Sequence, residues 1–417
     1  MKHYQLALAA ELIGTVVSGA APADRAIDAA FRARRQMGAQ DRRLVAETVY
    51  AWLRRRRTVE RAVGPGGNDL DRAAASATLE LGLGARALSS AGYTGDAAAL
   101  VTRLRQPVPP ELSFAEKADL PDWLGERLLA AFGPDEALAL ARALNQPAPV
   151  DLRVNTLRTN RDQLVTSLGA EGIETQPTPH SPWGLRRSAR APLSATKAFR
   201  EGEFEVQDEG SQLVSALVEP VPGERVCDFC AGAGGKTLHL GALMENRGTV
   251  YAFDTAARRL ANLTLRARRA GLSNVRASVI RDENDARVKR LRGSLDRVLV
   301  DAPCSGTGTL RRNPDIKWRA LDLPALTARQ NAILEAAARL VRPGGRLVYV
   351  TCSLLHEENE DIISGFLGRA AEFRVVPVND VLRRLNVPLQ MPGEPLRLYP
   401  HRHHTDGFFA AILVRQS

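Results

Sequence analysis

After residue 216, short apolar runs alternate with amphipathic ones, and this alternation restricts the fold more than any other feature of the chain. The apolar runs cover residues 224–230, 248–254, 275–280, 295–302 and 345–352, and helical patterns lie between them. Strands separated by helices are typical of βαβ units. We therefore predict an α/β domain at 216–417, built on a doubly wound, mostly parallel sheet whose ligands sit at the carboxyl ends of the strands. The last run, 408–415, follows a loop and is expected to add an antiparallel strand.

The first third of the chain has a different pattern. Apolar residues recur at three- and four-residue spacing in segments such as 41–63, 69–83 and 122–132, which predicts an all-helical domain over residues 1–140. Residues 64–68 and 105–113 are rich in Gly and Pro and read as loops. Between the two parts, residues 141–215 mix one helical pattern with short extended pieces, which predicts a small α+β module that connects the domains or contacts RNA.

The N-terminal run 5–18 superficially resembles a secretory signal, because it follows Lys2 and precedes small residues. Glu11 interrupts it, however, and residues 26–37 continue with a helical period, which favours the first helix of a soluble domain. No apolar stretch reaches the ~18 residues of a membrane span. The four cysteines lack the spacing of a disulfide framework, so we expect a cytoplasmic protein that does not associate with membranes.

The formal net charge is +10, from 57 basic and 47 acidic residues. Such an excess favours a polyanionic partner, for example nucleic acid, although the compositional bias of a GC-rich genome produces the same excess. Four consecutive arginines, Arg54–Arg57, either face RNA phosphates or form a solvated face.

A glycine-rich loop follows the first predicted strand, within residues 227–237. Gly232, Gly234 and Gly235 allow a tight turn and close backbone approach to a ligand, and the next helix presents free amide groups. Thr237 occupies the third glycine position of a GxGxxG motif. The loop thus predicts a nucleotide-like cofactor and gives little support to NAD.

Acidic residues follow the next two strands. Asp254 ends the second strand, 20 residues after Gly234, where a carboxylate can hold the ribose hydroxyls of an adenosyl group. Asp282 follows the third strand and is placed to meet the adenine or its ribose. Either acid alone can equally be a helix cap. A glycine loop and two acids at successive strand ends point to a binding site.

Cys227 and Cys230 form a CxxC pair, which suggests a zinc or redox site. No second pair lies at metal-ligand spacing, and Cys227 falls within a strand where a small side chain packs well, so structural roles are favoured.

The other two cysteines, Cys304 and Cys352, each end a strand. A thiolate that adds to carbon 6 of cytosine makes carbon 5 nucleophilic toward a methyl donor, and a second thiol can assist release. Asp301 is placed to bind the cytosine edge, and Lys236 to hold the base or the cofactor.

Several of these motifs resemble the Nop2/Sun family of RNA cytosine-5 methyltransferases. The similar segments are DAPCSGTGTLRRNPDIKW (301–318), TCSLLHEENE (351–360), CAGAGGKT (230–237) and LRLYPHRHHTDGFFAAIL (396–413). The helical N-terminus, especially DRRLVAETVYAWLRRR, is similar to the NusB-like domain of the bacterial 16S rRNA members.

This resemblance implies a Rossmann-like class I methyltransferase that uses S-adenosylmethionine. It makes Cys352 the nucleophile and Cys304 the release-assisting thiol, with Asp301 and Lys236 as further catalytic residues. The cofactor-binding candidates are Cys230, Ala231, Gly232, Ala233, Gly234, Gly235, Lys236, Asp254, Arg259, Asp282 and Asp301. The family usually reads CAAPGGKT, so Gly232 and Ala233 depart from its pattern, and Asp285 competes with Asp282 for the adenosyl group.

The segment after Cys304 supplies candidate RNA contacts. Arg311, Arg312, Pro314 and Trp318 suit the grip of a phosphate and a splayed base, although an ordered loop packed on a helix is the alternative. The histidines of 401–407 suggest a metal site, but their place before the last strand matches the family tail, and no metal is expected.

Together the resemblance and the motifs predict a monomeric enzyme that methylates carbon 5 of a cytosine in 16S rRNA. Methylation of tRNA is an alternative. Methylation of DNA, whose enzymes use the proline-cysteine dipeptide as nucleophile, is less favoured because the second thiol at Cys352 and the NusB-like helical domain both favour RNA. A non-catalytic RNA-binding or antitermination-like factor is the remaining alternative.

Overall fold

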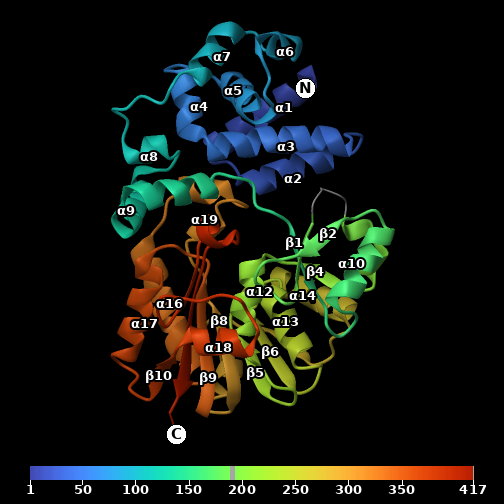
Figure 1. Ribbon diagram of the computed structural model, residues 1–417, viewed down its shortest axis with the longest axis vertical. Coiled ribbons are helices and arrows are strands. Elements are labelled where there is room, and N and C mark those ends of the chain that lie inside the picture. Colours follow the sequence, from blue (N-terminus) through green and yellow to red (C-terminus); the bar gives the residue numbers. More distant parts are fainter. Residues whose placement is uncertain (188–192, 417) are drawn as a thin grey trace. The chain divides into compact units, whose positions relative to one another are not determined.

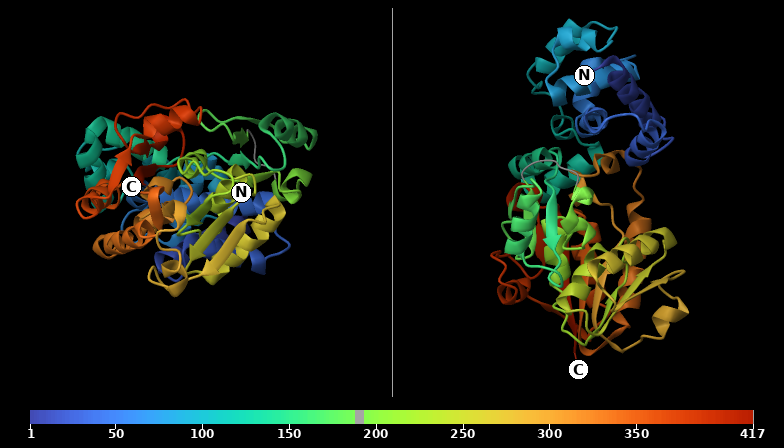
Figure 2. Two further views of the ribbon diagram at one scale, coloured as in Figure 1. Left: turned by 90° about the horizontal axis from the view of Figure 1, so that it is seen from below. Right: turned by 90° about the vertical axis from the view of Figure 1, so that its right-hand side faces the viewer.

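The computed structural model describes residues 1–187 and 193–416, and the chain divides into two compact units (Figures 1 and 2). The helical unit comprises Met1–Pro147 together with Leu310–Ala320. The larger unit comprises Ala148–Thr309 and Leu321–Ser417. The segment 310–320 therefore leaves the α/β part of the sequence and packs with the N-terminal helices, which the sequence pattern did not indicate.

The helical unit is built around apolar side chains that are fully buried, among them Leu6, Ile13 and Trp52. Its elements are α1 (His3–Val17), α2 (Ala23–Ala33), α3 (Ala39–Arg54), α4 (Arg56–Val63), α5 (Asp69–Leu81), α6 (Ala85–Ser90), α7 (Ala97–Arg105), α8 (Phe114–Lys117), α9 (Asp122–Leu144) and the 3₁₀ turn η3 (Pro314–Trp318). Within the described residues, none of the helices combines the length and apolar character that crossing a membrane requires.

Three details refine the helical pattern. The predicted segment 41–63 is two helices, because Arg55, at φ −116°, separates α3 from α4. In α9, Gly133 at φ 71° and Pro134 interrupt the helical geometry. The predicted helix 122–132 therefore ends directly before this interruption. Asn68 caps α5 by accepting from the amides of Leu70 and Asp71.

The larger unit begins with a small antiparallel sheet of order β2-β3-β1-β4. Its elements are β1 (Asp151–Val154), α10 (Arg161–Ala170), β2 (Thr175–Pro177), β3 (Gly184–Arg187), η1 (Leu193–Ala195), α11 (Lys197–Arg200) and β4 (Phe204–Val206). Leu152, Leu164 and Phe204 are fully buried between this sheet and its helices. The predicted α+β character of this region is thus what the structure contains.

The large sheet follows, with strands in the order β10-β12-β9-β8-β5-β6-β7 and β11 paired to β12. The strands are β5 (Arg225–Asp228), β6 (Thr249–Asp254), β7 (Val275–Val279), β8 (Leu295–Asp301), β9 (Val341–Thr351), β10 (Phe373–Val376), β11 (Leu396–Leu398) and β12 (Phe408–Arg415). The run β9-β8-β5-β6-β7 is parallel throughout, and β12 is antiparallel to β9 and β10. Both the parallel sheet and the antiparallel last strand are confirmed.

Helices cover both faces of this sheet, because alternate side chains of each strand point to opposite faces. Val298 and Val300 join one core with α16 and α17, whereas Leu299 joins the other core with α12, α13 and α18. The helices of the unit are α12 (Glu209–Ala216), α13 (Gly235–Leu243), α14 (Ala257–Ala270), α15 (Ala286–Lys289), α16 (Leu323–Ala338), α17 (Glu360–Leu367), α18 (Val378–Arg384) and α19 (Pro400–His403), with the 3₁₀ turns η2 (Thr307–Thr309) and η4 (His356–Glu358). The doubly wound fold is confirmed.

Candidate active site

The glycine loop joins β5 to α13 at the carboxyl end of the sheet. Gly232 and Gly234 both have positive φ, 54° and 88°, which non-glycine residues rarely adopt. A side chain at Gly234 would also meet Leu263, whose Cγ would lie 2.5 Å from the added Cβ. At Gly232 the space is open, so the backbone there is accessible to a ligand.

Two arginines fix this loop by donating hydrogen bonds to its backbone carbonyls. Arg153, on β1, is buried and donates to the carbonyl of Gly235 at 2.6 Å. Arg266, on α14, donates to the carbonyl of Ala233 at 2.7 Å and pairs with buried Glu205 at 2.9 Å. Burial lowers the pKa of Arg153 to about 9, so its guanidinium stays protonated at neutral pH. The sequence analysis missed both arginines, because their partners are backbone carbonyls distant in the chain.

Asp254 lies beside the loop, as predicted. Its Oδ2 accepts from the Gly232 amide at 2.8 Å and its Oδ1 from the Ala256 amide at 2.7 Å. Each carboxylate oxygen can accept a further hydrogen bond, so the side chain is oriented and still able to bind ribose hydroxyls.

Asp282 and Asp285 differ in what they already bind. Both oxygens of Asp285 accept backbone amides, from Arg287 at 2.9 Å and Arg281 at 3.1 Å, and the side chain caps α15. These amide bonds lower the pKa of Asp285. Asp282 accepts one backbone amide, from Asn284, and its other oxygen accepts from the exposed Arg281 side chain at 3.2 Å; the Asp282 side chain is 42% exposed. Asp282 is therefore the acid with more capacity to bind a ligand. The other cofactor candidate, Arg259, is exposed on α14.

Lys236 and Asp301 meet at the end of β8. The ammonium of Lys236 lies 2.7 Å from Asp301 Oδ2, and the lysine side chain is only 11% exposed. Burial alone would lower the pKa of Lys236, but the Asp301 carboxylate outweighs burial and the pKa lies above the usual lysine value. The same ammonium lies 5.5 Å from the ring centre of Phe408. A permanent cation is thus fixed at the edge of the site.

The two thiols come together at the ends of β8 and β9. Cys304 Sγ and Cys352 Sγ lie 3.3 Å apart, and both side chains are half-buried. The pKa of the Cys304 thiol lies well above its usual value, mainly because of the hydrogen bond to Cys352 and secondly because of burial. Cys304 therefore remains protonated at neutral pH, and its S–H is able to donate toward Cys352, although either sulfur can be the donor in this contact.

A buried carboxylate, Glu358, joins the two thiol loops, and the sequence analysis missed it. Glu358 accepts from the Ser305 amide at 2.8 Å and from Gln330 Nε2 at 2.8 Å, and Ser353 Oγ also donates to it. Ser305 follows Cys304 and Ser353 follows Cys352, so one side chain fixes both loops. The acidic run 357–360 was the available signal, but its pattern resembles an exposed helix start.

Cys227 lies in the apolar core between the sheet and α16, whereas Cys230 is half-buried at the start of the loop. Burial raises the pKa of both thiols well above the usual cysteine value. Across residues 1–187 and 193–416, no group of three or more His, Cys, Asp or Glu side chains is arranged to hold a metal ion.

The candidate RNA-contacting residues lie in the segment that packs into the helical unit. Arg311 and Pro314 are buried, and Trp318 Nε1 donates to the carbonyl of Leu53 at 2.7 Å. Arg312 is half-buried. The structure thus gives the segment an anchoring role, and RNA binding by these residues stays a prediction.

The run Arg54–Arg57 has internal partners as well. Arg54 is buried, Arg57 Nη2 lies 2.7 Å from the Asp122 carboxylate, and Arg56 lies over the ring of Trp318 at 5.1 Å. These arginines tie the helical unit together.

Comparison with known proteins places this geometry in a family. The family described as 16S rRNA methyltransferase RsmB/F matches residues 215–414, and the ferredoxin-like domain of the same proteins matches residues 120–193. A probable ribosomal RNA small subunit methyltransferase B of Synechocystis is 33% identical, over 94% of this chain and 95% of its own. The chain belongs to the RsmB/F family of 16S rRNA methyltransferases.

Further relatives and solved structures agree. Ribosomal RNA small subunit methyltransferase B of Klebsiella pneumoniae is 36% identical over 71% of this chain and 66% of its own length. A methyltransferase homologue from Pyrococcus horikoshii, 29% identical, matches with a TM-score of 0.62 over 74% of this chain and all of its own. The structure called PH0851, 28% identical, covers 99% of both chains with a TM-score of 0.79.

RsmB/F proteins use S-adenosylmethionine, and the residues of this chain fit that cofactor. The open backbone at Gly232, the oriented carboxylate of Asp254 and the acid at Asp282 lie at three successive strand ends. When bound, S-adenosylmethionine supplies the methyl group. The fold places its site at the same sheet edge as the two thiols.

Proposed function

We propose that this RsmB/F protein methylates carbon 5 of a cytosine in 16S rRNA through a covalent adduct with Cys352. The observation that carries the proposal is the pair of thiols, 3.3 Å apart, at the sheet edge that also holds the Lys236–Asp301 pair. Methylation of an exocyclic nitrogen needs no such pair, whereas carbon 5 of cytosine needs activation by a nucleophile.

In the proposed reaction the Cys352 thiolate adds to carbon 6 of the cytosine and forms a C–S bond. The electron pair displaced from the C5–C6 double bond makes carbon 5 the nucleophile, which takes the methyl group as the bond between that methyl group and the donor sulfur breaks. Solvent water then accepts the proton from carbon 5, the electron pair of that C–H bond restores the double bond, and the C–S bond breaks with its electron pair on sulfur to return the thiolate.

The contacts of each thiol support this assignment of roles. Cys304 stays protonated and can donate to Cys352, which stabilises a negative sulfur there. The Lys236 ammonium interacts electrostatically with Cys352 and adds to this stabilisation. Cys304 then supplies a proton donor beside the sulfur that must leave in the last step.

We assign Asp301 and Lys236 to the cytosine. Asp301 ends β8, and its side chain is 31% exposed, so one oxygen can accept from the exocyclic amine while the other binds Lys236. Lys236 keeps its charge beside the ring and opposes the negative charge that builds up on the base after thiolate addition.

Transfer of a labelled methyl group from S-adenosylmethionine to unmodified 16S rRNA, followed by mass spectrometry of the nucleosides, tests the proposal. We expect 5-methylcytidine from the unaltered chain, none from Cys352→Ala, and a stalled RNA–protein complex from Cys304→Ala on a denaturing gel. Parallel reactions with tRNA and with duplex DNA show whether the substrate class is right.

Cys227→Ala is the matched control, because it removes a thiol from the core and not from the site. It should cost about 1 kcal/mol of stability and retain turnover. Another methylated nucleoside, or undiminished turnover by Cys352→Ala, would overturn the proposed chemistry.

A further inference from the structure

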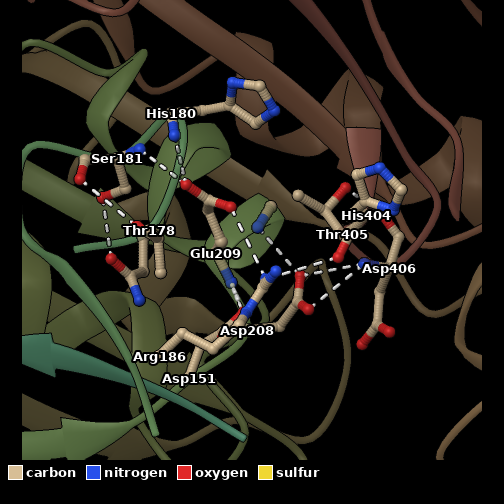
Figure 3. Close-up of polar contacts among 12 residues, drawn as sticks. Asp151, Thr178, His180, Ser181, Arg186, Asp208, Glu209, His404, Thr405 and Asp406 are labelled. Atoms are coloured by element: carbon tan, nitrogen blue, oxygen red, sulfur yellow. Dashed lines mark hydrogen bonds and ion pairs between the residues drawn. The ribbon is translucent and has the colours of Figure 1, made fainter. Parts of the chain in front are cut away.

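The histidine-rich motif 401–407 forms a turn that the small module clamps. We define the tail turn as residues 399–407. It contains α19, which is capped at its carboxyl end by the left-handed residue His404 at φ 58°. Arg186 Nη2 donates to the His404 carbonyl at 3.3 Å, and both oxygens of Asp208 accept the Asp406 amide at 3.2 Å (Figure 3).

The clamp is itself rigid. The guanidinium of Arg186 is held by both oxygens of Asp151, at 2.7 and 3.0 Å (Figure 3). Neighbouring Glu209 is fully buried and accepts the amides of His180 and Ser181 at 2.6 and 2.7 Å. Buried, hydrogen-bonded carboxylates such as these hold their partners in one geometry.

The other side of the tail turn reaches the thiol loops. The Gly407 amide donates to the Gly308 carbonyl at 2.8 Å, and the Gly308 amide donates to the Cys352 carbonyl at 2.9 Å. A side chain on Gly308 would bring its Cβ within 2.3 Å of the Gly407 carbonyl, so glycine is required for this approach. Two hydrogen bonds therefore separate the tail turn from the backbone of Cys352.

The tail turn carries a cluster of rings, defined as Tyr399, His401, His403 and His180 from the adjacent loop. The ring centres of Tyr399 lie 5.9 Å from His401 and 6.3 Å from His403, and His180 lies 6.3 Å from His403. All four residues are half-buried. Burial lowers the pKa of His403 to about 4, so its ring is neutral at physiological pH, and its Nδ1 accepts from the Tyr399 amide at 2.9 Å.

An exposed cation, Arg402, lies beside the ring cluster. Arg402 is exposed and lies 5.7 Å from the Tyr399 ring centre, whereas the neighbouring carboxylates of Asp208 and Asp406 are buried. Flat rings next to an exposed guanidinium suit an unstacked base and its phosphate, and this combination is how proteins bind single-stranded RNA.

We propose that the ring cluster binds a nucleotide adjacent to the target cytosine, in single-stranded RNA. The proposal rests on the proposed function and adds to it a second RNA-binding position, fixed relative to the thiols by the tail turn. It also gives the histidine motif a role other than metal binding.

Anisotropy of a short fluorescein-labelled single-stranded RNA with one cytosine, measured with the full chain, tests this binding. Tyr399→Leu should weaken RNA binding about tenfold, from loss of one stacking contact, and Tyr399→Phe should restore it. Arg402→Gln should weaken binding and reduce its salt dependence, whereas Arg374→Gln, an exposed arginine on β10, should change neither. Affinity for S-adenosylmethionine, measured by calorimetry, should stay unchanged in every variant.

Wild-type affinity in Tyr399→Leu overturns the ring cluster as an RNA site, whatever reaction the enzyme catalyses. An equal loss in Tyr399→Leu and Tyr399→Phe also overturns it, because the hydroxyl and not the stacking ring would then account for binding. A loss together with a lower melting temperature overturns it as well, because the tyrosine would then act through the fold. If the unaltered chain binds this RNA and loses affinity in Tyr399→Leu but makes no 5-methylcytidine, the proposed function fails and the RNA site stands.

Discussion

Lys236 in the larger unit and Lys317 in the helical unit are both withdrawn from solvent, but they bind opposite kinds of partner. Lys236 faces a carboxylate, Asp301, and its pKa lies above the usual value. Lys317 is 1% exposed and its ammonium faces neutral oxygens, and burial lowers its pKa to about 7. Its three acceptors are the carbonyls of Arg54 (3.0 Å) and Asp119 (2.7 Å) and Asn145 Oδ1 (2.7 Å).

The partner, a carboxylate or neutral oxygens, determines what a buried lysine contributes. A carboxylate partner keeps Lys236 charged, which electrostatic catalysis at the sheet edge requires. Neutral partners make Lys317 a donor to these oxygens, to all three as the ammonium and to two as the neutral amine, and it fixes the segment 310–320 in the helical unit. The first should matter to rate and the second to stability.

Removal of the catalytic charge should have the largest effect. Lys236→Met is expected to lower kcat/KM for methyl transfer at least about 100-fold, because the site loses the cation that opposes charge on the base. Lys289→Met, an exposed lysine on α15, is the control and should keep full activity. If kcat/KM of Lys236→Met is within tenfold of the value for the unaltered chain, Lys236 does not have the catalytic role that distinguishes it from Lys317.

Removal of the helical-unit lysine should affect stability. Lys317→Met is expected to lower the free energy of unfolding by about 3 kcal/mol, because three buried oxygens lose their donor. Urea unfolding followed by tryptophan fluorescence measures this, since Trp52 and Trp318 both pack in the helical unit. An unchanged unfolding midpoint would show that the three hydrogen bonds do not hold the segment.

The two lysines should also differ in pH dependence. Between pH 7 and the usual lysine pKa, Lys317 is protonated when unfolded and neutral when folded, so the unfolded state binds more protons and stability rises with pH. We expect a gain of about 2 kcal/mol between pH 7 and pH 9 that Lys317→Met lacks. Lys236 stays charged throughout this range in both states, so Lys236→Met should retain the gain.

Arg153 is a third buried cation. Like Lys317 it has neutral partners, but it lies in the catalytic unit, and we expect its removal to have a smaller effect than removal of either lysine. Arg153→Met should lower the affinity for S-adenosylmethionine about tenfold, since the Gly235 carbonyl loses its donor and the loop is less ordered. Calorimetry with Arg268→Met, an exposed arginine on α14, is the matched control. Equal affinities in the two variants would limit Arg153 to a structural role.

The sequence predicted the sheet and the residues at its carboxyl edge because both depend on local pattern. Strands such as 295–302 are short apolar runs, and parallel order brings Asp254, Cys304 and Cys352 to one edge. The packing of 310–320 into the helical unit could not be predicted, because Lys317 finds its acceptors more than 170 positions away in the chain.

Glu358 shows the same limit within the site. Its neighbours in the sequence are polar, so the run suggests a solvated turn, and only the tertiary structure shows its carboxylate fully buried between two loops. The tail turn is similar: its histidines suggested a metal, while Gly407 and Asp406, which fix its position, carry no pattern of their own.

The position of β12 has a consequence for how this protein is made. This strand lies between β9 and β10 and is also paired with β11, all of which precede it in the sequence. Until residues 408–415 have left the ribosome, β9 and β10 present unpaired edges that can join other chains. A nascent chain without β12 is therefore prone to aggregation, and a premature stop before residue 408 should send the product to chaperones and proteases.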